Sequence, residues 1–128
     1  MENRNVELTE AEWSIMECLW ERAPRIGREI IEEMEAKNDW NRSTTLTLLR
    51  RLEAKGVVES TSEGIKTFSP LVGRDEVAHY ETENLLDRVY KGSLSMLVSA
   101  FTKKKALSKD EIEELYAILH KAEENNND

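Results

Sequence analysis

WNRSTTLTLLRRLEAK, residues 40–55, is the stretch of this sequence that decides the fold. With successive residues set 100° apart, as on an α-helix, its apolar side chains gather in one sector and its polar side chains lie opposite. The apolar sector holds Thr45, Leu48, Leu49 and Leu52, and the opposite face holds Ser43, Thr47 and Arg50. The segment therefore predicts an amphipathic helix with one face packed on a core and the other presented to solvent.

Charge separates this helix from the rest of the chain. Four cationic side chains and one acid, Glu53, give residues 40–55 a net charge of +3, whereas the whole 128-residue chain carries −8. An acidic protein has no general attraction to nucleic acid, so cations clustered on one helix indicate local docking on DNA phosphates. A face that is only solvated, or a surface that docks another protein, is the alternative interpretation.

The segments before this helix predict a compact helical start. Thr9-Glu10-Ala11-Glu12 is a capping box, and the helix that it begins should end before Pro24, which disfavours helix in the residue ahead of it. A short edge strand is expected at residues 25–26, and a second helix at residues 27–37.

The segments after it predict a hairpin. Ser43 is the expected N-cap of the central helix, and Gly56 is its expected stop. Residues 57–60 and 66–69 predict two short strands joined by a turn. The order of helix, strand, helix, helix, strand, strand is that of a winged helix-turn-helix module, in which the third helix enters the major groove.

Residues after Pro70 follow a different pattern. Helices are expected at residues 75–91, from Leu94 onwards and behind a capping box at residues 108–111, with residues 103–105 as a basic connector. Their apolar stripes are too few to enclose one another, so burial against a second copy of the chain, in a homodimer, is the simpler solution. The expected interface residues are Leu85, Leu86, Val89, Leu94, Leu97, Val98, Phe101, Ile112, Leu115, Ile118 and Leu119.

These patterns place a domain boundary after residue 72. Residues 1–72 are expected to form a winged-helix DNA-binding domain, and residues 73–128 a helical dimerisation domain. The expected fold class is mainly α: an α+β winged helix-turn-helix followed by an all-helical dimerisation region. Because two-fold dimers suit two-fold operators, double-stranded operator DNA is the expected partner.

The expected DNA contacts follow from side-chain chemistry on the helix at residues 43–55 and on the wing, which is the hairpin predicted at residues 57–69. Serine and threonine bond to base edges or phosphates, and arginine offers a two-pronged donor to guanine or phosphate. A lysine on the wing is expected to reach a phosphate, a contact that sets register without reading sequence. The full set is Arg42, Ser43, Thr44, Leu46, Thr47, Arg50, Arg51, Lys55 and Lys66.

Other kinds of chemistry have little support. Cys18, His79 and His120 show no metal-ligand spacing, and neither a phosphate-binding glycine loop nor a catalytic carboxylate pair is found. No metal, no cofactor and no enzymatic activity are therefore expected. A lone cysteine fits a reducing cytosol and no apolar run is long enough to span a membrane, so a cytoplasmic protein without membrane insertion is expected. A redox role for Cys18 stays as a further hypothesis.

Several stretches together resemble one family. They are LTEAEWSIMECLW at 8–20, DW at 39–40, TLLRRLEAKG at 47–56, SPLV at 69–72, NLLDRVYKGSLSMLVSAF at 84–101 and LSKDEIEELYAIL at 107–119. The chain resembles the BlaI/MecI/CopY family of bacterial repressors, also called penicillinase repressors. The resemblance implies a dimer that binds a dyad-symmetric operator, often with TACA and TGTA elements. It also assigns DNA contacts to Thr44, Thr47 and Arg51, which match the family pattern.

The chain departs from that pattern in the helix and in the tail. Ser43 stands where relatives commonly carry lysine, and Leu46 where they often carry arginine or lysine, so the operator or the affinity is expected to differ. Sensor-linked proteolysis in the antibiotic-responsive members implies a possible cleavage site and a protease partner. Relatives have Asn-Phe there, whereas this chain has Ala100-Phe101, and burial of Phe101 in the dimer interface is the favoured interpretation. The cysteine pattern of the copper-responsive members is missing.

Overall fold

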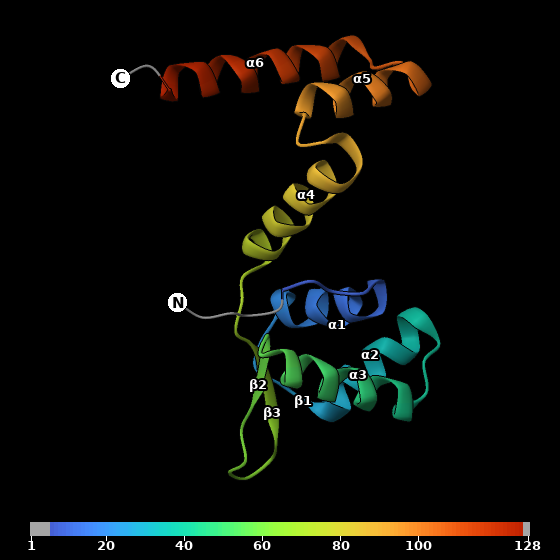
Figure 1. The fold of residues 1–128 in the computed structure, drawn as a ribbon. Coiled ribbons are helices and arrows are strands. Elements are labelled where there is room, and N and C mark those ends of the chain that lie inside the picture. The colour runs from blue at the N-terminus through green and yellow to red at the C-terminus, as the bar shows by residue number, and fades with distance from the viewer. Residues whose placement is uncertain (1–5, 127–128) are drawn as a thin grey trace. The chain divides into compact units, whose positions relative to one another are not determined.

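The computed structural model describes residues 6–126 and contains helices and a small sheet (Figure 1). The elements are α1 (Glu10–Glu21), β1 (Arg25–Ile26), α2 (Gly27–Asn38), α3 (Arg42–Lys55), β2 (Val58–Ser60), β3 (Thr67–Pro70), α4 (Arg74–Tyr90), α5 (Leu94–Lys104) and α6 (Lys109–Asn125). The strands form one antiparallel sheet in the order β1-β3-β2. This confirms the predicted fold class, a mainly helical chain with a winged helix-turn-helix.

The chain divides into two compact units, one ending at Asn84 and the other beginning at Leu85. Helix α4 carries the chain from the first unit into the second. The boundary expected after residue 72 stays a prediction about function, because the division at residue 84 reflects compactness and does not show which residues bind DNA or a second subunit.

The N-terminus of α1 has the predicted capping box. The Glu12 amide donates to Thr9 Oγ1 over 3.1 Å, and the Thr9 amide donates to Glu12 Oε1 over 2.9 Å. Two amides that the helix leaves without partners are thereby satisfied, and α1 ends at Glu21, ahead of Pro24 as expected.

The start of α3 differs from the prediction. Asn41, not Ser43, is the N-cap, because its side-chain oxygen accepts a 2.8 Å hydrogen bond from the Thr44 amide. Asparagine caps as well as serine does, so both positions were suitable from sequence, and Arg42 becomes the first helical residue. The end of α3 follows the prediction, since Gly56 takes the left-handed conformation at φ 80°.

The hairpin is displaced slightly from its predicted bounds. Val57 lies ahead of β2 because its amide donates to the Leu52 carbonyl over 3.2 Å and closes the end of α3. Strand β3 extends to Pro70, which pairs with Val58 in the register. Gly64, at φ 65°, turns the wing.

The core of the first unit lies where α1, α2 and α3 meet the sheet. Its buried side chains come from every one of these elements, and each such side chain contributes about 1.5–3 kcal/mol. The residues are Ile15, Met16, Leu19, Ile30, Met34, Leu48, Leu49, Leu52, Val57, Val58, Phe68, Val72 and Val77, together with Val6, Leu8 and Cys18. The predicted inward face of α3 is confirmed, Thr45 included.

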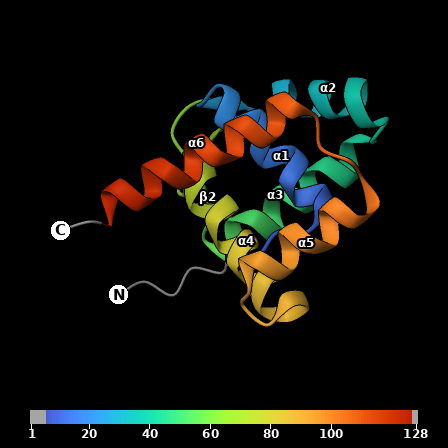
Figure 2. The ribbon, with the colours of Figure 1, turned by 90° about the horizontal axis from the view of Figure 1, so that it is seen from above.

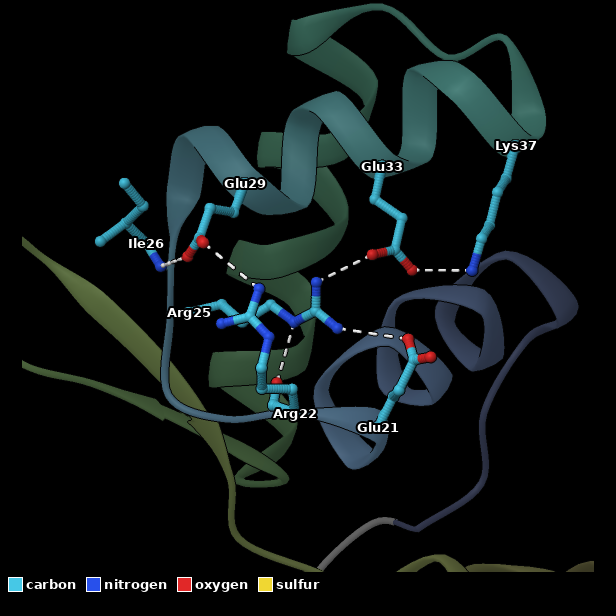
Figure 3. Close-up of polar contacts among 7 residues, drawn as sticks. All are labelled: Glu21, Arg22, Arg25, Ile26, Glu29, Glu33 and Lys37. Carbon is cyan, nitrogen blue, oxygen red and sulfur yellow. Dashed lines mark hydrogen bonds and ion pairs between the residues drawn. The ribbon is translucent and has the colours of Figure 1, made fainter.

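A buried arginine ties β1 to the two neighbouring helices (Figure 3). Arg25 is 6% exposed and donates to Glu33 over 2.8 Å, to Glu21 over 3.3 Å and to the Arg22 carbonyl over 2.9 Å. Lys37 donates to the other oxygen of Glu33 over 2.8 Å. With these partners the burial of Arg25 is tolerated, and the two-residue strand β1 gains a fixed place between α1 and α2.

A second buried pair joins α1 to the end of α3. The Glu12 carboxylate is 1% exposed and accepts from Lys55 Nζ, which also donates to the Glu7 carbonyl over 2.8 Å. Burial disfavours ionisation of Glu12, but the hydrogen bonds from Lys55 and from the Thr9 amide outweigh it and hold the pKa of this carboxyl below its usual value.

The second unit contains the end of α4 and the helices α5 and α6. The loop at residues 105–108 reverses the chain, so α6 does not continue the axis of α5 (Figure 2). Lys103 and Lys104 form the last turn of α5, so the predicted basic connector is wrong for them; only Lys105 lies in the loop, as the C-cap. Lysines at a helix C-terminus are favoured by the helix dipole, which explains why α5 continues through them.

The capping assignment is testable by two substitutions. Asn41→Ala should lower the free energy of unfolding by about 1 kcal/mol, because the Thr44 amide loses its acceptor. Ser43→Ala should change it by less than about 0.5 kcal/mol, as at an ordinary exposed position. Urea denaturation followed by circular dichroism measures both, and the reverse ranking would place the cap at Ser43.

The buried Glu12 carboxylate predicts a pH dependence of stability. Its pKa is lower in the folded chain, so its contribution is present above the unfolded pKa of about 4.3 and is lost as the pH falls through the lower folded value. Glu12→Gln should therefore cost about 2 kcal/mol at pH 7 and progressively less below pH 4. Urea midpoints across pH measure this, with the exposed Glu10→Gln on the same helix as control. A deficit that stayed constant down to pH 3 would contradict it.

Candidate nucleic-acid interface

One face of α3 is mainly polar and largely exposed along the helix. Ser43, Arg50 and Ala54 are exposed and Thr47 is half-buried, and their spacing of three and four residues makes one continuous strip. Arg51 and Thr44 are exposed beside it. The strip lies opposite the buried leucines, so a groove of DNA can approach it without disturbing the core.

Exposed cations lie near both ends of α3. Arg42 is exposed at the first turn, and Arg50 and Arg51 are exposed near the last turn. The acid of the helix, Glu53, is half-buried and accepts a hydrogen bond from the Ser60 hydroxyl at the base of the wing. The acid that most directly opposes an incoming phosphate is therefore engaged by the protein itself.

The wing is a narrow hairpin with an exposed tip. Thr61 and Thr67 close its base, since the Thr67 amide donates to Thr61 Oγ1 over 3.1 Å and the Thr61 amide donates to the Thr67 carbonyl over 3.0 Å. Lys66 is exposed, with its ammonium 5.4 Å from the centre of the Phe68 ring. Ile65 beside it is 74% exposed. The wing thus presents a cation and an apolar side chain.

Two expected contact residues have other surroundings. Lys55 binds Glu12 and the Glu7 carbonyl, so its ammonium points to the start of α1. Leu46 is half-buried against the hydrophobic core. Sequence periodicity placed Lys55 on the helix flank correctly but gave no sign of its partner, which is 43 residues away along the chain.

Apolar side chains remain exposed throughout the second unit. No residue from Leu85 to Asn126 is buried, and α5 and α6 face each other across a groove with a mainly apolar lining. Leu86 and Leu97 are half-buried, whereas the other expected interface residues are 38–63% exposed: Leu85, Val89, Leu94, Val98, Phe101, Ile112, Leu115, Ile118 and Leu119. Such apolar exposure marks a surface made for association.

The Ala100-Phe101 peptide bond lies inside α5. Ala100 is half-buried, and the Phe101 side chain is 53% exposed, with the Lys105 ammonium 5.9 Å from its ring centre. A protease binds an extended backbone, so cleavage here requires α5 to unfold locally.

The described residues also bear on the metal, membrane and redox hypotheses. Between residues 6 and 126 no group of three potential metal-ligating side chains comes together, and no helix has both the length and the apolar character to cross a membrane. Cys18 is 2% exposed, and burial raises the pKa of its thiol to about 11. Little of it is thiolate at neutral pH, which opposes a redox role.

Comparison with known proteins gives one consistent result. The family model for penicillinase repressors matches residues 8–121. The methicillin resistance regulatory protein MecI of Staphylococcus aureus is 36% identical over 122 residues, which cover 94% of this chain and 99% of that protein. The penicillinase repressor of Bacillus licheniformis is 30% identical over 114 residues, 88% of this chain and 89% of that protein.

Solved structures agree for the first unit. The DNA-binding domain of the repressor BlaI aligns with a TM-score of 0.53 and 25% identity, over 59% of this chain and 93% of that domain. Bacillus licheniformis BlaI in its monomeric form, in complex with the blaP half-operator, aligns over the same shares with a TM-score of 0.52. From the family match over residues 8–121 and these relatives, the chain belongs to the penicillinase repressor family, whose members are repressors and not enzymes.

Proposed function

We propose that this chain is a dimeric, sequence-specific transcriptional repressor that acts in the cytoplasm of a bacterial cell. Each subunit lays α3 in the major groove of one half of a dyad-symmetric operator, and the bound dimer blocks the promoter. The observation that carries this proposal is the exposed, mainly polar strip on α3, together with the exposed arginines at the first turn and near the last turn of that helix. Support comes from the fold of the BlaI domain, whose solved complex holds a half-operator.

The proposed DNA contacts fall into two groups: contacts to bases, which read the sequence, and contacts to phosphates, which position the protein on the DNA. Thr47 lies on the exposed strip, Thr44 and Arg51 lie exposed beside it, and we assign base contacts to these three. Arg42, Ser43 and Arg50, together with Lys66 on the wing, are assigned to phosphates, where charge and register matter more than sequence. We leave Lys55 and Leu46 out of this set, because Lys55 binds Glu12 and Leu46 packs on the core.

The dimer is assigned to the tail, residues 73–128, and DNA binding to residues 1–72. A second copy of the chain is the partner that the exposed apolar residues of α5 and α6 favour, since two copies bury the same stripes against each other. The half-sites are then about 10 base pairs apart, or a small multiple of that. A sensor-linked protease that cleaves at Ala100-Phe101 would have to unfold α5 first, so we assign Phe101 to the interface.

Selection from a random duplex library is the direct test of this function. The intact chain should enrich a palindrome, protect both halves from nuclease, and sediment as a dimer. Enrichment of no sequence, combined with failure to bind a DNA column at low salt, would favour the alternative of a protein-docking module. Sedimentation as a monomer at micromolar concentration would contradict the proposed dimer.

Arg51 is expected to carry much of the operator discrimination. Arg51→Ala should lower the preference for the selected palindrome over a scrambled duplex by about 1–3 kcal/mol per half-site, because one bidentate contact is lost. Fluorescence anisotropy measures both affinities, and sedimentation should show an unchanged dimer. Lys121→Ala, an exposed cation on α6, is the control. If Arg51→Ala keeps the full preference for the palindrome, the base contact assigned to Arg51 is wrong.

Salt dependence distinguishes the phosphate contacts. A dimer with three phosphate-binding cations per subunit should show a plot of log K against log salt with a slope of roughly −5. Lys66→Ala should weaken binding to all duplexes alike and reduce the steepness by about 2, one contact per subunit. Anisotropy titrations from 50 to 300 mM salt test this; a slope near zero would contradict phosphate binding.

A further inference from the structure

The first residue of α4, Arg74, is bound to two residues of α1, Trp13 and Glu17. Arg74 donates from Nε to Glu17 Oε1 and from Nη2 to Glu17 Oε2, both over 3.0 Å. The indole N–H of Trp13 donates to Glu17 Oε2 over 2.9 Å, and the Arg74 guanidinium lies 5.5 Å from the centre of the Trp13 ring. We call Trp13, Glu17 and Arg74 the α4 clamp. All three belong to the first unit.

The neighbouring residues of α4 do not explain why an arginine stands at position 74. It is the first residue of α4, where the helix dipole favours acids and disfavours a cation. Asp75 and Glu76, the next two residues, already supply the favourable charge. The placement of an arginine there is explained by Glu17 on α1, whose carboxylate accepts two hydrogen bonds from Arg74.

Buried valines on either side of the clamp also attach the start of α4. Val77, one turn further along α4, is fully buried in the core, and Val72, just before the helix, is 4% exposed with its carbonyl accepting from the Trp20 indole over 2.8 Å. These contacts anchor the start of the helix. A single anchor leaves a helix free to swing, whereas a second contact on the neighbouring turn fixes its direction.

The clamp itself is solvent-exposed. The side chains of Arg74 and Glu17 are 51% and 43% exposed, so the pair adds little to overall stability compared with the buried valines. Two parallel hydrogen bonds are nevertheless directional, and they constrain angle more than they lower energy. The hydrogen bonds from Arg74 also hold the pKa of the Glu17 carboxyl below its usual value, so the pair stays charged at neutral pH.

We propose that the α4 clamp determines operator spacing, by fixing the direction in which α4 leaves the DNA-binding unit. This inference rests on the proposed dimeric repressor and assigns positioning residues to it. Each added base pair moves a half-site by about 3.4 Å and turns it by roughly 35°. A pair of subunits joined through stiff helices follows such a change poorly, and a pair with loose helices follows it readily.

The test uses the full chain and the palindrome obtained by selection. Duplexes with one or two base pairs added or removed between the half-sites, and a duplex with a single half-site, are titrated by anisotropy. The wild-type chain is expected to lose affinity for every altered spacing. In Arg74→Ala the ratio of altered-spacing Kd to natural-spacing Kd should fall about threefold, the scale of one well-formed exposed pair, while the half-site Kd stays within about twofold.

Matched variants separate the clamp from general effects. Glu17→Ala and the double variant should flatten the spacing profile as much as Arg74→Ala does, because either change breaks the same pair. Arg74→Lys keeps the charge but loses the two-pronged geometry and should give an intermediate profile. Glu10→Ala, which removes an exposed acid from the first turn of α1, should leave the profile unchanged.

The outcomes distinguish this inference from the function on which it rests. If the wild-type chain binds no palindrome, the proposed repressor fails. If the wild-type chain prefers one spacing and Arg74→Ala keeps that preference in full, the clamp has no positioning role. Equal loss of half-site and palindrome affinity in Arg74→Ala would also overturn the inference, since it would mean that the clamp supports the fold of the DNA-binding unit.

Discussion

The packing of α3 on α1 and α2 is the constraint on which the rest of the structure depends. Leu48, Leu49 and Leu52 are at most 6% exposed, and their burial fixes the rotation of the helix about its own axis. Turning α3 by one residue, 100°, would bring Arg50 or Arg51 toward the core, where an unpaired charge costs several kcal/mol. The hydrophobic core therefore decides which side chains face solvent, and the polar strip is its consequence.

Electrostatic interactions in this acidic chain act mainly over short distances. Charges more than about 8 Å apart at physiological salt are largely screened, so the overall charge of −8 governs approach more than contact. Part of the acidic charge is also used within the protein, in ion pairs that join different helices and strands. These pairs are Glu12–Lys55, Glu33–Arg25 and Glu17–Arg74. The three arginines of α3 remain exposed, so under the proposed function they are the first groups that a phosphate would meet.

Much of the fold follows from patterns within single segments. Apolar periodicity gave the inward face of α3, the Thr9–Glu12 capping box gave the start of α1, and Gly56 gave the end of α3, because each depends on residues close in the chain. The N-cap at Asn41 was missed because two residues with equal capping ability lie two positions apart. The Lys55–Glu12 pair was missed because helical spacing shows which side of a helix a cation occupies, but not which residue 43 positions away receives it.

In the proposed dimer, the tail would place oligomerisation and DNA binding under one physical control. Between Leu85 and Asn126 no side chain is buried, so the helices there would gain their hydrophobic stabilisation when a second subunit covers them. Under the proposed function a single α3 would contact one half-site, and joining two of them would make the second contact intramolecular, which raises affinity without any new contact on DNA. An event that separates the tails would then release the operator while every residue of α3 stays in place. Regulation of the proposed dimer would thus act on the apolar helices, far along the chain from the α3 residues proposed to read the DNA.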